Sequence, residues 1–379
     1  MELVRRASKE IRLGSVGRRA ASAAWAPRAA AAAVLTGGCG AATPGAGPGA
    51  GARSFDPAAA LADPKSHTGP STAVVAEAAI EPIATNPRPA LPATVTDAQG
   101  TLVTVTDVSR LLALDIYGTT SRIVFSLGLG ANVIGRDTSS GFAEIQDLPR
   151  VTPSGNTLSA EAILELAPSV IITDTSLGPW DVLLQMREAG IPVVVVDSHR
   201  SLDTAAELIG QVAAALGLPD EGAELAQRTE RQIAAAKEAI AKAVPAADQD
   251  RLRMAFLYLR GSAGVYYLFG SGSGTDSLIT ALGGIDVASE VGWDGMQPVT
   301  DEGLVAMSPD LILVMTRGLE SVGGVDGLLE RLPAVAATPA GTKRRFVDMD
   351  DAQILAFGPN SADVLDALAT AIYTPEAAQ

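Results

Sequence analysis

Residues Met254–Gly284 read MAFLYLRGSAGVYYLFGSGSGTDSLITALGG, which combines two apolar runs, a glycine loop and a helix signal. The first run, Met254–Leu259, has the length and composition of a buried strand. Tyr258 and Arg260 are two residues apart, so on a strand their side chains point to the same face. A phenol beside a guanidinium, close to a flexible loop, indicates a ligand site. The alternative is a core tyrosine followed by a solvated arginine.

The glycine loop offers a second interpretation. Gly270–Gly274 follows the apolar-aromatic run Val265–Phe269 and precedes a helix signal that begins at Thr275. A glycine loop in this position can cradle phosphate, which would indicate a nucleotide-dependent enzyme. However, the spacing is G-x-G-x-G rather than G-x-G-x-x-G, and no Lys-Ser or Lys-Thr pair follows. We therefore expect a binding protein that is not an enzyme.

Composition excludes several functional classes. The 379 residues carry a net charge of −15, and seven of the 28 basic residues fall in the first 38 positions, so the rest is more acidic still. Such a surface repels phosphate backbones, which argues against nucleic acid as a partner. The chain has one cysteine, Cys39, and two histidines, His67 and His199. These are too few for an intrachain disulfide and for most zinc sites, and a single cysteine at Cys39 also argues against Cys–His nucleophilic chemistry.

The N-terminal region has the features of an export signal followed by a tether. Residues 1–38 are basic at the front and contain the short apolar run Ala29–Leu35. The segment LTGGC, which ends at Cys39, resembles a bacterial lipobox with one residue more than the usual spacing. Cys39 is therefore the expected lipidation site; the alternative is a disordered Ala/Arg leader. Residues 39–96 are rich in Ala, Gly, Pro, Ser and Thr and are expected to be a disordered tether.

Beyond the tether, short Val/Ile/Leu runs alternate with helical patterns, as in parallel strands covered by helices on both faces. Pro219 starts a long helix that we expect to reach Val244, about 39 Å at 1.5 Å per residue. This length suits a rigid strut. We predict an α/β protein with two Rossmann-like βα lobes and a ligand cleft between them. The predicted ranges are 97–217 for the first lobe, 218–250 for the interlobe helix and 251–379 for the second lobe.

The two predicted lobes share a motif. Glu161 is followed after six residues by Pro168 and an apolar run, and Glu302 is followed in the same way by Pro309 and an apolar run. Val196-Asp197 likewise matches Val347-Asp348, and Leu127–Gly130 parallels Leu282–Gly284. Three such matches indicate two related lobes.

The order of signal, tether, lobe, long helix and second lobe resembles the substrate-binding proteins of metal-chelate ABC importers, over about residues 97–372. Three runs are similar to haem-binding lipoproteins of the HmuT type: AFLYLRGSAGVYYLFGSGSGTDSLI at 255–279, PVTDEGLVAMSPDLILVMTRGLESVGG at 298–324 and VDMDD at 347–351. The resemblance implies an exported monomer, lipid-anchored to the outer face of the cytoplasmic membrane. Such a protein captures haem as cargo and delivers it to an ABC permease and its ATPase.

The same resemblance implies roles for individual residues. Tyr258 matches a tyrosine that ligates haem iron, and Arg260 matches an arginine that favours the phenolate form. Met315 matches a pocket position against the porphyrin, although a buried strand methionine explains it equally well. Glu161 and Glu302 match glutamates that dock into basic pockets of the permease; at a helix start, each also complements the helix dipole.

The first lobe departs from the family at the second axial ligand. The family has a histidine in the loop that reads Pro153–Leu158 here, and Asn156 occupies its place. Because an amide is a poor ligand for ferric iron, we expect coordination by Tyr258 alone or with a water opposite, held by Asn156. His199 is a further candidate, with a solvated loop histidine as the alternative. The competing interpretation keeps the scaffold and changes the cargo to a ferric siderophore or corrinoid.

Two further candidates for the ligand site follow from their places in the chain. Arg136 follows an apolar strand and is expected to pair with a haem propionate. Trp293 lies in the loop before Glu302 and is expected to stack on the macrocycle. The alternatives are a surface salt bridge and a packed aromatic ring.

Overall fold

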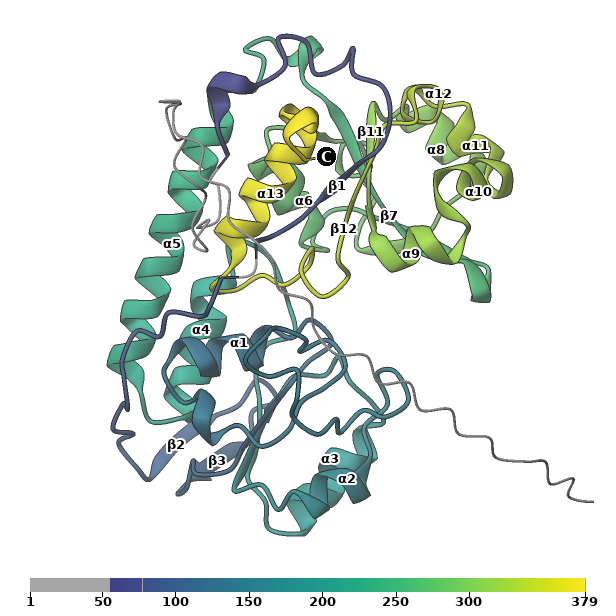
Figure 1. Ribbon diagram of the computed structural model, residues 1–379. Coiled ribbons are helices and arrows are strands. Elements are labelled where there is room, and N and C mark those ends of the chain that lie inside the picture. Colours follow the sequence, from purple (N-terminus) through teal and green to yellow (C-terminus); the bar gives the residue numbers. More distant parts are fainter. Residues whose placement is uncertain (1–54, 77, 379) are drawn as a thin grey trace, which may run out of the picture. The chain divides into compact units, whose positions relative to one another are not determined.

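The computed structural model describes residues 55–76 and 78–378 (Figure 1). The predicted export signal, the lipidation site Cys39 and the first part of the predicted tether lie outside these residues. Among the helices described, none is long and apolar enough to cross a membrane.

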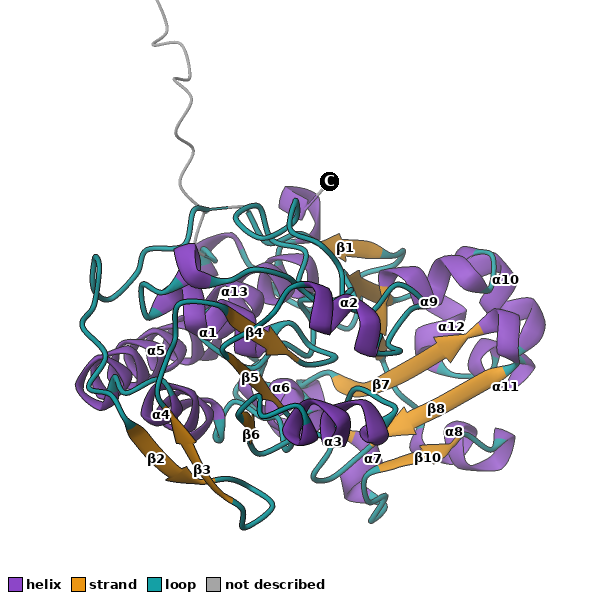
Figure 2. Cartoon of the chain, turned by 90° about the horizontal axis from the view of Figure 1, so that it is seen from below, coloured by secondary structure: helices purple, strands orange, loops and turns teal. Residues whose placement is uncertain are grey.

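The second lobe is built on a seven-stranded sheet in which the continuous apolar runs form parallel strands (Figure 2). Its order in space is β1-β12-β11-β7-β8-β10, with β9 beside β7. β8 and β10 run antiparallel to their neighbours, and the others are parallel. The carboxyl ends of β7, β11 and β12 therefore meet at one edge. The strands are β1 Ser71–Ala73, β7 Arg253–Arg260, β8 Val265–Phe269, β9 Ile285–Asp286, β10 Met296–Pro298, β11 Leu311–Met315 and β12 Phe346–Met349.

Side chains alternate between the two faces of this sheet, and each face has its own core. Met254 and Phe256 pack with residues of α5, α6 and α13, a face we call the α13 face. Ala255 and Leu257 pack with residues of α7 to α12, which we call the α8 face. The helices are α6 Thr275–Ala281, α7 Val287–Glu290, α8 Asp301–Met307, α9 Thr316–Ser321, α10 Gly324–Arg331, α11 Pro333–Ala336, α12 Pro339–Lys343 and α13 Ser361–Tyr373.

The first lobe has a three-stranded parallel sheet, ordered β4-β5-β6, and a separate hairpin of β2 and β3. Every residue of the three parallel strands is buried. Its strands are β2 Ala93–Thr96, β3 Leu102–Val105, β4 Leu111–Leu114, β5 Val170–Thr173 and β6 Val193–Val195. Its helices are α1 Thr119–Ser126, α2 Ala160–Glu165, α3 Trp180–Glu188 and α4 Ala205–Ala215. Short 3₁₀ helices lie at η1 Pro57–Ala59, η2 Gly130–Asn132, η3 Asp248–Asp250, η4 Gly261–Ala263 and η5 Pro375–Ala378.

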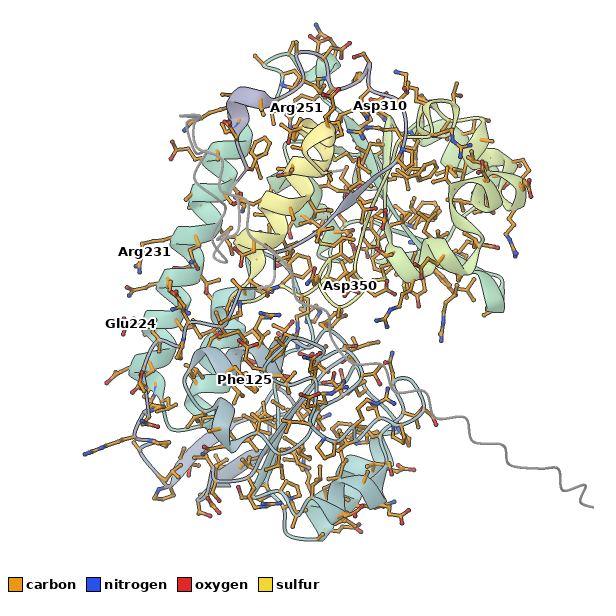
Figure 3. The ribbon with its side chains drawn as sticks, viewed as in Figure 1. Phe125, Glu224, Arg231, Arg251, Asp310 and Asp350 are labelled. Atoms are coloured by element: carbon orange, nitrogen blue, oxygen red, sulfur yellow. The ribbon has the colours of Figure 1, made fainter. Side chains whose placement is uncertain are left out.

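The long predicted helix is α5, Pro219–Ala241, with proline in its first turn as expected. It ends three residues before the predicted Val244. α5 contributes Leu225 to a core cluster of the first lobe and Ile233 and Ile240 to the α13 face of the second. Charged side chains such as Glu224 and Arg231 point away from the other helices (Figure 3). α5 is therefore shared by both lobes, as a strut must be.

The prediction of a disordered tether is wrong for the described residues between 55 and 96. Phe55 is 5% exposed, and its ring centroid lies 6.2 Å from that of Tyr373. β1 pairs in parallel with β12 and completes one edge of the second-lobe sheet. β1 has three residues, which is too short for a periodic strand signal, and the surrounding Ala and Pro obscured it.

Candidate functional site

Tyr258 lies near the carboxyl end of β7 and is half-buried on the α13 face. Its ring stacks on that of Phe269 in β8, with centroids 6.0 Å apart and ring planes at 25°. Arg260 ends the strand and is exposed. Alternation along β7 gives both side chains the same face, as the sequence predicts. Within the described residues, no salt bridge engages Arg260, so its guanidinium is available to a ligand.

Strand register places more ligand-binding chemistry beside Tyr258. Tyr267 of β8 is directly opposite Tyr258. β11 pairs Val314 with Leu257, so Met315, the next residue, neighbours Tyr258 on the other side. Tyr267 and Met315 both pack against the core of the α13 face. Phenols, a thioether and a guanidinium thus share one edge of the sheet. Tyr267 was not among the predicted site residues, because its place beside Tyr258 depends on the register between β7 and β8.

Asn156 is exposed in a turn closed by a bridge between Ser154 and Thr157. The Thr138 hydroxyl donates to the Gly155 carbonyl at 2.7 Å, and this hydrogen bond connects the turn to the loop that contains Thr138. Asn156 belongs to the first lobe and Tyr258 to the second. No hydrogen bond among the described residues joins the two, so their relation through a shared ligand stays a prediction.

His199 is a solvated loop histidine, the alternative we considered. Its side chain is 80% exposed, and Nδ1 lies 2.7 Å from the Asp197 carboxylate. The His199 backbone N–H also donates to that carboxylate, and this hydrogen bond is the main reason that the pKa of Asp197 lies below its usual value.

Trp293 lies away from Tyr258, whereas the pairing of Arg136 with a haem propionate stays a prediction. The Arg136 guanidinium donates from Nε to the Gln146 carbonyl and from Nη1 to the carbonyls of Asp137 and Ser140, so it holds its own loop together. Trp293 packs against the core of the α8 face, and Tyr258 packs against the core of the other face. The structure therefore separates Trp293 from Tyr258 by the thickness of the sheet.

Three buried carboxyl groups, none of them among the predicted site residues, lie at or beside the strand ends of the first lobe. Asp115 and Asp174 follow β4 and β5, and Asp137 lies beside them and accepts from the Asp115 backbone N–H. Arg200 Nη2 lies 2.7 Å from Asp174 and 3.5 Å from Asp115. Burial raises the pKa of Asp137 to about 7, with the Asp115 charge adding to it. Burial and Asp115 raise the pKa of Asp174 to about 6.

The same region connects the lobes. The Arg200 guanidinium lies 5.5 Å from the ring centroid of Tyr117, which packs against the α13 face of the second lobe. The Leu202 backbone N–H donates to the Ser277 hydroxyl of α6 at 3.1 Å. The sequence signal for Asp115 and Asp174 was an acidic residue directly after an apolar strand, whereas Asp137 had no such signal.

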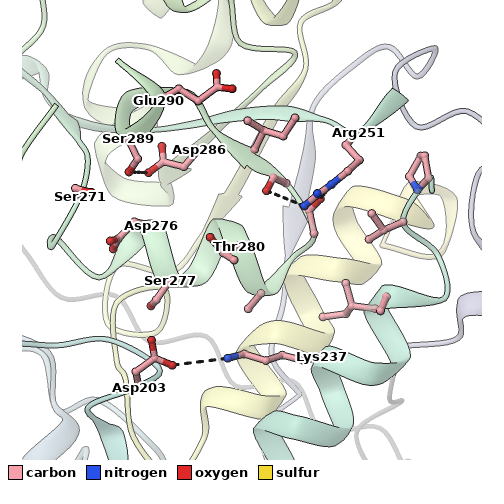
Figure 4. Close-up of a pocket in the computed structure, with 18 of the residues that line it drawn as sticks. Asp203, Lys237, Arg251, Ser271, Asp276, Ser277, Thr280, Asp286, Ser289 and Glu290 are labelled. Atoms are coloured by element: carbon pink, nitrogen blue, oxygen red, sulfur yellow. Dashed lines mark hydrogen bonds and ion pairs between the residues drawn. The ribbon is translucent and has the colours of Figure 1, made fainter. Parts of the chain in front are cut away.

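A large depression lies elsewhere, between α5 and α6 (Figure 4). Its volume is about 1010 Å³, and it is lined by charged, hydroxyl-bearing and aliphatic side chains that include the pair Asp203 and Lys237, 3.9 Å apart. It contains no aromatic ring and no thioether, and Tyr258 does not line it. Because a metal chelate needs a ligating group and a flat apolar contact, we place the candidate site at Tyr258.

Comparisons with known proteins agree with the two-lobed fold. Residues 116–353 match the family described as periplasmic binding protein. The chain belongs to that family. Periplasmic binding proteins are binding components of transport rather than enzymes, and the family implies an extracytoplasmic location and an ABC permease as partner. The predicted family and fold class are therefore confirmed. Among curated proteins, none matches this chain.

Several solved structures of haem-binding proteins are similar to this periplasmic binding protein. One is the haem-binding protein HmuT, with 40% identity, a TM-score of 0.77, and coverage of 82% of this chain and 99% of that chain. Another is the periplasmic haem-binding protein RhuT from Roseiflexus sp. RS-1 in apo form, with 38% identity, a TM-score of 0.63, and coverage of 72% and 100%. A third is BhuT in complex with two haems, with 30% identity, a TM-score of 0.61, and coverage of 71% and 99%.

Variants of HmuT have also been solved. Single alanine substitutions replace a tyrosine, an arginine and a histidine of that protein. The tyrosine and arginine are two positions apart, as Tyr258 and Arg260 are here.

Proposed function

We propose that this chain is the extracytoplasmic haem-binding subunit of an ABC importer. It binds ferric haem through Tyr258 and delivers it to a permease and its ATPase, as a monomer anchored through lipid on Cys39. The observation that carries the proposal is the 40% identity to HmuT over 82% of the chain, combined with a tyrosine and an arginine two residues apart at the carboxyl end of β7.

The chemistry of this edge suits ferric haem. A phenolate is a strong ligand for ferric iron, and a guanidinium on the same face of the strand offers a positive charge near it. Met315 and Phe269 offer apolar contact to a flat macrocycle beside Tyr258. Asn156 lacks a donor that ferric iron prefers, so its proposed part is to hold a water in the sixth position. Arg136 retains Nη2 for a propionate, and Trp293 is left out of the site because it lies on the α8 face.

Two exposed glutamates form the proposed permease-docking surface. Glu161 lies in the first turn of α2 and Glu302 in the first turn of α8. A hydroxyl caps each helix in the same way: Ser159 accepts from the Ala162 N–H, and Thr300 accepts from the Gly303 N–H. Equivalent placement of one carboxylate on each lobe supports docking into two basic pockets.

The test is an absorption titration of ferric haem into the full-length protein, with Tyr258→Phe and Tyr266→Phe alongside. Tyr266 is a matched control because it is the neighbour of Tyr267 on the other face of the sheet. We expect a saturable Soret band with tyrosinate charge-transfer features in the wild type and in Tyr266→Phe. Tyr258→Phe should weaken binding by about tenfold or more, a loss of roughly 1.4 kcal/mol. No saturable change in the wild type would contradict a haem cargo and favour a ferric siderophore or corrinoid.

A further inference from the structure

Tyr267 is a second phenol at the same edge of the sheet. It is directly opposite Tyr258 in the antiparallel pair of β7 and β8. In such a pair the two Cβ atoms lie about 4.5–5.5 Å apart, and both side chains leave the sheet on the same side. Both rings are half-buried, and both pack against the core of the α13 face. Its neighbour Tyr266 packs against the α8 face instead.

Arg260 is placed to act on both phenols. It is two residues from Tyr258 along β7, and it pairs in register with Val265, which is two residues before Tyr267 on β8. Arg260 and Tyr267 are therefore diagonal neighbours on one face, about 7–8 Å apart by strand geometry and within reach of a long side chain. In the described part of the chain, no hydrogen bond engages the hydroxyl of either tyrosine.

We propose that ferric haem at this edge is held by a pair of phenols, Tyr258 and Tyr267, either of which can supply the iron ligand. This proposal rests on the proposed haem-binding function. One phenol loses its proton to solvent when its oxygen binds iron, and the other donates a hydrogen bond to the resulting phenolate. Such a bond to a charged acceptor is about twice as strong as one between neutral groups, so the pair stabilises the anion that iron requires. When one hydroxyl is removed, the other takes its place beside Arg260.

The experiment is a set of ferric haem titrations on the full-length protein, read by the tyrosinate charge-transfer band and by the iron–phenolate stretch in resonance Raman spectra. The variants are Tyr258→Phe, Tyr267→Phe, the double variant of these two, and a control double variant, Tyr258→Phe with Tyr266→Phe. Phenylalanine removes only the hydroxyl, and circular dichroism checks that each variant folds. We expect both single variants and the control double variant to retain the tyrosinate signals, and the variants that lack the Tyr258 hydroxyl to show them together with the weaker haem binding given above. The double variant at Tyr258 and Tyr267 should lose them.

Two results would overturn the proposal: loss of the tyrosinate signals in Tyr258→Phe alone, or their persistence in the double variant at Tyr258 and Tyr267. Either result leaves haem binding by the wild type intact, so only the paired-phenol proposal fails. Absence of haem binding by the wild type is a different outcome, because it overturns the proposed function and this inference with it.

Discussion

Asp137 is a carboxyl group that folding buries without a cation of its own. It is 1% exposed, and Arg200 pairs with Asp115 and Asp174 instead. Burial raises the pKa of Asp137 to about 7, compared with about 3.9 for an aspartate in an unfolded chain. A raised folded-state pKa means that the folded state binds the proton more tightly. This contribution to stability is complete below about pH 4 and is lost as the pH rises through 7.

We expect the free energy of unfolding to fall between pH 5 and pH 8, by up to a few kcal/mol, because each pKa unit corresponds to about 1.4 kcal/mol. Asp174, with a pKa near 6, acts in the same direction. Asp137→Asn should flatten the slope, because the amide is neutral throughout. Urea denaturation at pH 5, 6, 7 and 8 measures the free energy of unfolding and therefore its slope with pH. Asp203→Asn is the control, since Asp203 is 81% exposed. Equal slopes in wild type and Asp137→Asn would contradict the assignment.

At the scale of elements, the buried guanidinium of Arg345 connects β1 to the rest of the second lobe. Arg345 is 1% exposed, and burial lowers its pKa to about 10. Its Nη1 donates to the hydroxyl of Ser71 in β1 at 3.1 Å, and its Nη2 donates to the Ile372 carbonyl of α13. Arg345 Nε has no partner among the described residues. Loss of either remaining hydrogen bond would therefore leave a further donor of this guanidinium buried without a partner.

Ser71→Ala should destabilise the protein by about 1–3 kcal/mol, because it leaves a second guanidinium donor buried without a partner. Chemical denaturation monitored by circular dichroism gives the value. Ser66→Ala is the matched control, since the Ser66 hydroxyl donates to the Asp63 carbonyl at the surface and should change stability little. A Ser71→Ala variant as stable as the control would mean that β1 contributes little to the lobe.

The proposed permease-docking surface, Glu161 in α2 and Glu302 in α8, gives a prediction about transport. Charge reversal of Glu161 and Glu302 to lysine should lower haem uptake by cells by about tenfold or more, because like charges at an interface cost several kcal/mol. Haem titration and thermal stability should stay at wild-type values. The control reverses Glu224 and Glu238 of α5, which are also exposed. Equal uptake by the two double variants would argue against docking through α2 and α8.

Elements with a strong local pattern were predictable, and those defined by tertiary pairing were not. The apolar runs of β4, β5 and β7 and the proline-initiated α5 follow from periodicity and capping alone. β1 has three residues and becomes a strand only because β12 offers it an edge.

The same limit applies to the site. The spacing of Tyr258 and Arg260 fixed their common face, whereas Tyr267 joined them through strand register. Trp293 was misplaced because the face on which a loop packs is not encoded in its position along the chain.

For the whole molecule, the two lobes share side chains as well as the helix between them. α5 contributes to core clusters on both sides, Arg200 covers the ring of Tyr117 against the second lobe, and Leu202 bonds to Ser277. Opening the lobes therefore requires breaking packed and hydrogen-bonded contacts near the buried acid cluster. This favours a protein that binds its ligand with little relative motion of the lobes.

Net charge makes a prediction about the rate of binding. The chain carries −15, and ferric haem with two ionised propionates is also negative, so the long-range force is repulsive. Salt screens it, since the Debye length falls from about 30 Å at 0.01 M to about 8 Å at 0.15 M. We expect the association rate constant, measured by stopped-flow quenching of tryptophan fluorescence, to rise on the order of twofold over this range.

The control is haem with both propionates esterified, which is positively charged and should bind more slowly as salt rises. Two exposed arginines, Arg260 at the end of β7 and Arg317 in α9 directly after β11, act in the opposite direction for natural haem. If the association of natural haem slowed with salt, attraction by these two guanidinium groups would outweigh repulsion by the net charge of the chain. Arg260→Gln with Arg317→Gln would then reverse the trend. If association instead speeds up with salt, the same pair of substitutions should make the rise steeper, because two positive charges are lost from this edge of the sheet.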